Sequence, residues 1–89
     1  MAQVHFTSWL REIVPDGPLN AAGATVGDVL AAVFAQRPNV RGYVLDDQGG
    51  LRKHMTILVD GQRIRDVETL SDAVRPDSEV WVMQALSGG

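Results

Sequence analysis

Apolar and polar residues alternate along several short stretches of the chain, which is the pattern of half-buried strands. The alternation is clear over residues 3–7 and 79–84, and weaker over residues 19–22. Residues 55–59 form an almost unbroken apolar run that is typical of a central strand. Asp60-Gly61 after this run is a hairpin signal, and it predicts a short returning strand over residues 62–65. The pattern therefore predicts four or five strands.

One stretch has a helical period instead. Thr25 is a good N-cap residue, and Asp28 three positions later gives an acidic version of the capping box. Pro38 disfavours helical geometry in the residue before it. The spacing predicts a helix over about residues 25–36, with one apolar stripe that must pack on the strands. The stripe consists of Val26, Val29, Leu30, Val33 and Phe34.

The remaining segments carry weaker signals. Residues 8–14 predict one short helical turn, and residues 69–74 predict another, with Ser71-Asp72 at its start. Residues 38–54 are expected to form a long connection with an exposed turn at 46–50. The adjacent Asp46 and Asp47 in that turn are interpreted as solvated carboxylates, because their spacing matches no calcium loop.

Composition limits the possible functions. The 89 residues are 45% hydrophobic and 21% charged, as in one ordinary globular domain. The absence of cysteine excludes disulfides, thiol catalysis and a cysteine-ligated metal. The net charge of −3 argues against nucleic acid as a partner. Neither a membrane-spanning run nor a signal-peptide pattern is present, so we expect no membrane association and a cytoplasmic location.

Catalytic chemistry is the least expected function. The sequence offers no acid–base pair, metal cluster or activated nucleophile that would assemble into a site. His5 and His54 could meet across two strands, but without an evident carboxylate partner we interpret them as surface residues. We therefore expect no metal and no permanently bound cofactor.

The chain ends in Ala85-Leu86-Ser87-Gly88-Gly89. Glycine has no Cβ, so Gly88 and Gly89 can pass where the backbone must approach another surface closely. The carboxylate of Gly89 is therefore the group that can enter a narrow pocket of another protein. In the alternative interpretation the two glycines are incidental, because many chains end in small, loose residues. We expect a folded domain over 1–84 and a flexible tail over 85–89.

A second candidate site follows from the strand alternation. If Val80 and Val82 face the helix, then Trp81 and Met83 face the opposite side of the sheet, and Leu58 of the neighbouring strand joins them. We call Leu58, Trp81 and Met83 the sheet patch, and expect it to bind a protein partner, because clustered exposed apolar residues mark docking sites. The alternative is that the 38–54 connection covers Trp81, for instance through Tyr43.

The order of these elements, together with the tail, resembles ubiquitin and the bacterial sulfur carriers of the MoaD/ThiS family. Residues 6–12 look like the segment after the first strand in molybdopterin-synthase small subunits, where Leu-Arg-Glu is usual. Residues 57–64 and 69–72 are similar to the corresponding run of ubiquitin, and Leu58 stands where ubiquitin has a binding isoleucine. The resemblance implies an α+β, ubiquitin-like β-grasp fold: a mixed four- to five-stranded sheet packed on one main helix.

The resemblance also implies a function. An activating enzyme of the MoeB/ThiF type would use ATP to adenylate Gly89, and a sulfide or persulfide would convert it to a thiocarboxylate. The chain would be a co-substrate, not an enzyme, and would donate this sulfur to an acceptor enzyme of molybdopterin, thiamine or cysteine biosynthesis. Gly88 would enter the partner, and Leu86 and Ser87 would line the entry. The alternatives are a protein modifier joined through Gly89 to lysines, and a non-catalytic β-grasp interaction domain.

Overall fold

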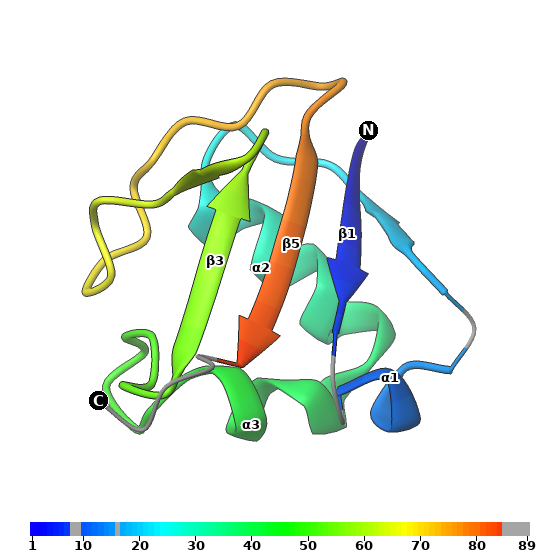
Figure 1. The fold of residues 1–89 in the computed structure, drawn as a ribbon, viewed down its shortest axis with the longest axis vertical. Coiled ribbons are helices and arrows are strands. Elements are labelled where there is room, and N and C mark those ends of the chain that lie inside the picture. Colours follow the sequence, from blue (N-terminus) through cyan, green and yellow to red (C-terminus); the bar gives the residue numbers. More distant parts are fainter. Residues whose placement is uncertain (8–9, 16, 85–89) are drawn as a thin grey trace.

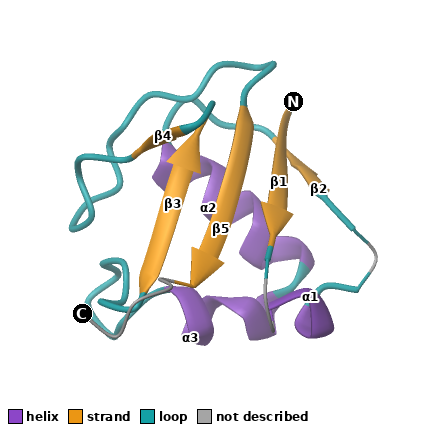
Figure 2. Ribbon diagram, in the orientation of Figure 1, coloured by secondary structure: helices purple, strands orange, loops and turns teal. Residues whose placement is uncertain are grey.

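The computed structural model describes residues 1–7, 10–15 and 17–84. One sheet lies against one main helix, with shorter helical segments at one end (Figure 1, Figure 2). This confirms the predicted α+β arrangement of a mixed sheet on one helix. The elements in chain order are β1 (Ala2–Phe6), α1 (Leu10–Ile13), β2 (Leu19–Ala21), α2 (Val26–Gln36), a 3-10 turn (Pro38–Val40), α3 (Arg41–Val44), β3 (Met55–Val59), β4 (Gln62–Arg63) and β5 (Glu79–Gln84).

The last strand lies in the middle of the sheet. The strand order is β2-β1-β5-β3-β4. The pairing of β1 with β5 is parallel, whereas β1–β2, β3–β5 and β3–β4 are antiparallel. Figure 1 shows β5 between β1 and β3, with α2 behind them. Residues from the two ends of the described chain therefore meet in the centre of the sheet.

Local signals explain the start and end of α2. The Thr25 side chain accepts a hydrogen bond from the backbone N–H of Asp28 at 3.2 Å, as the capping pattern predicts. Arg37 has left the helical conformation (φ −137°, ψ 78°), as expected for a residue before Pro38. The predicted stripe faces the sheet: Val26, Val29, Leu30 and Val33 are buried, and Phe34 is partly buried.

The core lies between α2 and the inner face of the sheet. Val4, Ile57, Val80 and Val82 point inward from three neighbouring strands and are fully buried. Leu10, next to the end of β1, is also fully buried. Burial of each such side chain contributes about 1.5–3 kcal/mol. The three central strands, β1, β5 and β3, are therefore anchored in the core on one face, and their opposite face is turned away from α2.

The β3–β4 turn follows its sequence signal. Asp60 and Gly61 both have positive φ, 51° and 85°. Two positive φ angles are the mark of the turn type that suits the right-handed twist of a hairpin. Val59 pairs with Gln62 across it. The returning strand is shorter than predicted, because it ends at Arg63 and the Arg65 N–H donates to the Asp72 side chain instead.

The prediction of a helical turn over residues 69–74 is wrong. Leu70 is in the left-handed region (φ 60°), and Ala73 forms a β-bridge with Thr25. The carbonyls of Leu70 and Asp72 accept hydrogen bonds from the N–H groups of Gly27 and Val26 at 2.9 and 3.0 Å. This segment therefore completes the N-terminus of α2, which needs acceptors, instead of forming a helix of its own.

The 38–54 connection is more ordered than predicted. It contains the 3-10 turn and α3, which bury Val40 and Val44 in the core. The expected turn at 46–50 is present, and the Asp46 side chain accepts hydrogen bonds from the N–H groups of Gln48 and Gly50 at 2.9 and 3.0 Å. That carboxylate therefore stabilises the turn.

Candidate functional site: the outer face of the sheet

The three residues of the sheet patch lie on neighbouring strands. Leu58 of β3 pairs with Trp81 of β5, and Thr56 pairs with Met83. Along β5 the fully buried Val80 and Val82 alternate with Trp81, which is 36% exposed, and with Met83, which is half-buried. Because alternate residues of a strand point to opposite faces, Leu58, Trp81 and Met83 share the face that α2 does not cover. Their role in partner binding stays a prediction.

Trp81 has an aromatic neighbour on the same face. Its ring stacks on His5 of β1, with ring centroids 4.2 Å apart and planes 11° from parallel. The parallel register of β1 and β5 places these two residues directly opposite each other. One side of the indole is thus supported by the sheet itself. Tyr43, which sequence reasoning considered as a cover for Trp81, lies on α3 and is 45% exposed.

His5 has a carboxylate partner that sequence reasoning missed. The Nε2 atom of His5 lies 2.6 Å from the Oε1 atom of Glu79, which pairs with Gln3 two positions earlier in the same strand register. The alternation within residues 79–84 places Glu79 and Trp81 on one face, but only the pairing of β1 with β5 brings His5 to them. His54 is not part of this cluster, because β5 separates β1 from β3.

A hollow of about 210 Å³ adjoins the sheet patch. Its lining combines the stacked residues His5 and Trp81 with residues of α1 and of the loop between α1 and β2. The lining residues are His5, Phe6, Arg11, Val14, Pro15, Gly17, Pro18 and Trp81. The outer face therefore combines partly exposed apolar side chains with a recess beside Trp81, which suits contact with another protein.

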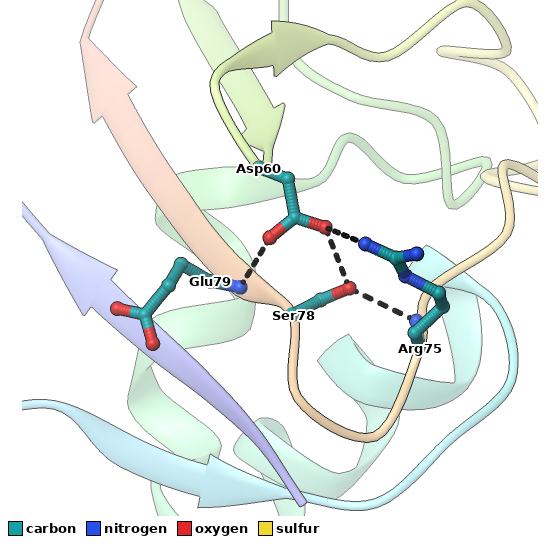
Figure 3. A network of polar contacts seen from close by, with 4 residues as sticks. All are labelled: Asp60, Arg75, Ser78 and Glu79. Atoms are coloured by element: carbon teal, nitrogen blue, oxygen red, sulfur yellow. Dashed lines mark hydrogen bonds and ion pairs between the residues drawn. The ribbon is translucent and has the colours of Figure 1, made fainter.

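A polar network holds the first residue of β5, at the end of the strand away from the tail (Figure 3). The carboxylate of Asp60 accepts hydrogen bonds from the Glu79 N–H at 2.9 Å and from the Ser78 hydroxyl at 2.8 Å. The Ser78 oxygen in turn accepts from the Arg75 N–H at 3.0 Å. The Glu79 N–H, with help from Ser78, lowers the pKa of Asp60. The network ties the β3–β4 turn to the start of β5 and so fixes the register of the outer face.

The predicted tail residues Leu86, Ser87, Gly88 and Gly89 lie outside the described residues. The strand before them is described up to Gln84, which pairs with Met55. Within the described part of the chain, no group of three or more histidine, aspartate or glutamate residues is placed to hold a metal ion. No helix in that part has the length and apolar character needed to cross a membrane.

The comparisons with known proteins agree with this geometry. A family model described as the ThiS family matches residues 4–89. Small archaeal modifier protein 3 of Haloferax volcanii is 29% identical over 66 residues, which cover 74% of this chain and 71% of that protein.

Solved structures match over nearly the whole chain. A chain of the BexX/CysO complex of Amycolatopsis orientalis matches with a TM-score of 0.85 at 19% identity, and all of both chains is covered. Small archaeal modifier protein 1 of H. volcanii matches with a TM-score of 0.79 at 26% identity over 99% of this chain and 98% of that chain. These matches confirm the ubiquitin-like β-grasp fold.

Proposed function

The chain belongs to the ThiS family of small ubiquitin-like carrier and modifier proteins, and from this membership we propose that it is a sulfur carrier. In this proposal the C-terminal carboxylate of Gly89 is activated and then carries one sulfur atom to an acceptor enzyme. The family match carries the proposal, because it extends through the terminal Gly88-Gly89. The chain acts as a protein co-substrate and not as a catalyst.

The chemistry explains why activation is needed. A carboxylate is a poor acyl donor, so an activating enzyme of the MoeB/ThiF type first joins Gly89 to AMP from ATP and releases pyrophosphate. A sulfide sulfur then attacks the acyl carbon, and AMP leaves. A persulfide donor first gives an acyl disulfide, and a thiol then cleaves its S–S bond, which releases the thiocarboxylate and leaves the donor sulfur in a new disulfide. The product is a thiocarboxylate whose sulfur is nucleophilic. The sequence has no cysteine, so no side-chain thiol competes with this terminus.

The fold supports the proposal in two ways. β5 is the central strand of the sheet and ends at Gln84, so the tail follows directly after a strand that is paired on both sides. The sheet patch offers an apolar surface on the same strand, through Trp81 and Met83. We propose that Leu58, Trp81 and Met83 dock on the activating enzyme while Leu86, Ser87 and Gly88 line its entry channel.

The direct test is the intact mass of the chain after incubation with ATP, a MoeB/ThiF-type enzyme and a sulfide source. We expect the mass change of one oxygen replaced by sulfur, absent without ATP. A chain that lacks Gly89 is the control, and it should show no change. An unchanged mass with several such enzymes that are active on their own carriers would contradict the proposal.

One observation favours a second function. The sequence similarity to small archaeal modifier protein 3 supports a protein modifier, in which the activated Gly89 forms an isopeptide bond with a lysine. The two functions share the activation step and differ in the acceptor. Covalent adducts in cells that disappear when Gly88-Gly89 is deleted would favour the modifier, whereas a thiocarboxylate on the free chain would favour the carrier. Lys53 is the chain's only lysine, so self-linked chains would join there.

A further inference from the structure

A second surface feature lies at the end of the sheet away from the tail. A hollow of about 420 Å³ opens between the β3–β4 hairpin and the segment that leads into β5. Arg63, Arg65 and Arg75 line it, and we call it the arginine hollow. We propose that the arginine hollow binds an acidic segment of a protein partner. The inference rests on this hollow alone and does not depend on the chemistry of the tail.

The three guanidinium groups are available to a partner. Arg63 and Arg65 are exposed, and neither forms an ion pair with a residue in the described ranges, although the charge of Arg65 contributes to the lowered pKa of Asp72. The Arg75 side chain is 76% exposed, and its guanidinium lies 3.9 Å from the Asp60 carboxylate, at the outer limit of an ion pair. Such a contact contributes little in water, so an incoming carboxylate can replace it at small cost.

Two aspartates also line the hollow, but backbone groups occupy their carboxylates. Asp60 accepts from the N–H of Glu79, as described above, and Asp72 accepts from the N–H groups of Arg65 and Asp66 at 2.9 and 2.8 Å. These backbone hydrogen bonds lower the pKa of Asp72 as they do that of Asp60. The aspartates therefore stabilise the backbone around the hollow. The lining contains three arginines and two aspartates, so it carries a net positive charge, although the whole chain has a net charge of −3.

The lining favours a peptide over a nucleotide. Its apolar members are aliphatic, chiefly Val59 and Ile64, and no aromatic ring is among the described lining residues to stack on a base. The guanidinium groups come from separate points of the chain around an open hollow. Arginine forks bind carboxylates in a bidentate manner, so several carboxylates along one acidic segment match this distribution.

The position of the hollow separates it from the tail. Arg75 precedes β5, whereas the tail follows its other end, and the six residues of β5 span about 20 Å. Arg63 lies on β4, the edge strand of the sheet, so the hollow is open at the margin of the molecule. A partner can therefore bind at the arginine hollow while the tail occupies a separate site on the same or another protein.

The test is a titration of the isotope-labelled full chain with octaglutamate peptide, followed by two-dimensional NMR. We expect shifts concentrated in residues 60–65 and 72–78, which weaken as salt is raised. The double variant Arg63→Gln/Arg65→Gln should lower the affinity about tenfold or more. Arg41→Gln removes an exposed arginine from α3 and should leave the affinity unchanged. The spectrum of each free variant shows whether it is folded.

Several results would overturn the proposal. One is the absence of shifts with octaglutamate at low salt. Another is an equal loss of affinity in the double variant and in Arg41→Gln, which would indicate general attraction. Inorganic phosphate is the competing probe. If it shifts the same signals at lower concentration than octaglutamate, the hollow is a site for small anions and not for an acidic segment.

Discussion

The imidazole of His5 stacks on the indole of Trp81, and this contact connects the first strand to the candidate docking face. The ring centroids are 4.2 Å apart, and the planes differ by 11°. Glu79 binds the edge of the same imidazole. Because His5 is held by both the strand and the carboxylate, it limits the positions that the exposed indole can adopt.

The stack leads to a prediction on the motion of Trp81. In a Trp9→Phe background Trp81 is the only tryptophan, and its fluorescence anisotropy reports the motion of its ring. His5→Ala should produce faster local rotation of the indole, because one side loses its support. His5→Phe keeps a flat ring and should retain most of the restriction. Equal anisotropy decays in all three proteins would contradict a supporting role for His5.

Trp81→Ala should weaken docking on the activating enzyme without unfolding the domain. Exposed aromatic anchors at interfaces contribute on the order of 2 kcal/mol, which is roughly thirtyfold in affinity. Binding of the variant is measured by calorimetry, and its fold by circular dichroism. The control is Tyr43→Ala, which removes an aromatic side chain of similar exposure (45% against 36%) from α3. Unfolding of the Trp81 variant would show that the residue belongs to the core.

Asp66 leads to a prediction on acid stability. Its carboxylate accepts hydrogen bonds from the side chains and N–H groups of Ser71 and Thr69, and the largest effect, from the Ser71 hydroxyl, lowers its pKa. A carboxyl whose pKa is lowered in the folded state stabilises the fold above the unfolded-state pKa of about 4. That stabilisation is lost as the pH falls through the folded-state pKa.

The measurement is the free energy of unfolding in urea at pH values from 7 downward. We expect it to decline below about pH 4 in the unmodified chain. The Asp66→Asn variant should have a lower free energy of unfolding than the unmodified chain at neutral pH. Its free energy of unfolding should also fall less steeply as the pH is lowered. The remaining decline comes from Asp60 and Asp72, whose pKa values are also lowered. Parallel pH curves for the two proteins would show that Asp66 does not contribute in its charged form.

Much of the frame could be predicted from the sequence, because its signals are local. The apolar period from Val26 to Phe34 and the cap at Thr25 place α2 within one residue of its observed start. Asp60-Gly61 places the hairpin, since its two positive φ angles suit these residue types. The order of elements and the terminal glycines then led to the family that the family model confirms.

The features that were missed depend on contacts between distant segments. The sequence does not show that the N-terminus of α2 takes its acceptors from Leu70 and Asp72, and so residues 69–74 looked helical. The His5–Glu79 contact and the arginine hollow depend on strand pairing and on the path of the segment before β5. Alternation alone predicts that Leu58 and Trp81 lie on one face. It does not show that β1 is the strand beside Trp81, or that His5 of β1 stacks on its indole.

Alanine substitutions at two glycines, Gly23 before α2 and Gly42 within α3, can test the packing around these helices. A Cβ added at Gly23 would lie 2.7–2.9 Å from atoms of Asp28 and the Val29 backbone, at the first turn of α2. Gly23→Ala must therefore shift the start of the helix, and we expect it to lower the free energy of unfolding by about 1–3 kcal/mol. A Cβ at Gly42, inside α3, would meet no atom of the other described residues within 4 Å, apart from its chain neighbours and the backbone of its own helix.

Gly42→Ala should therefore raise the free energy of unfolding by up to about 1 kcal/mol, because alanine loses less backbone freedom in a helix than glycine. Urea denaturation of both variants against the unmodified chain measures the two changes, which have opposite signs. If Gly23→Ala were neutral, the segment before α2 would move freely, and the cap at Thr25 would not fix the helix start. A destabilising Gly42→Ala would show that α3 needs glycine for a reason other than space.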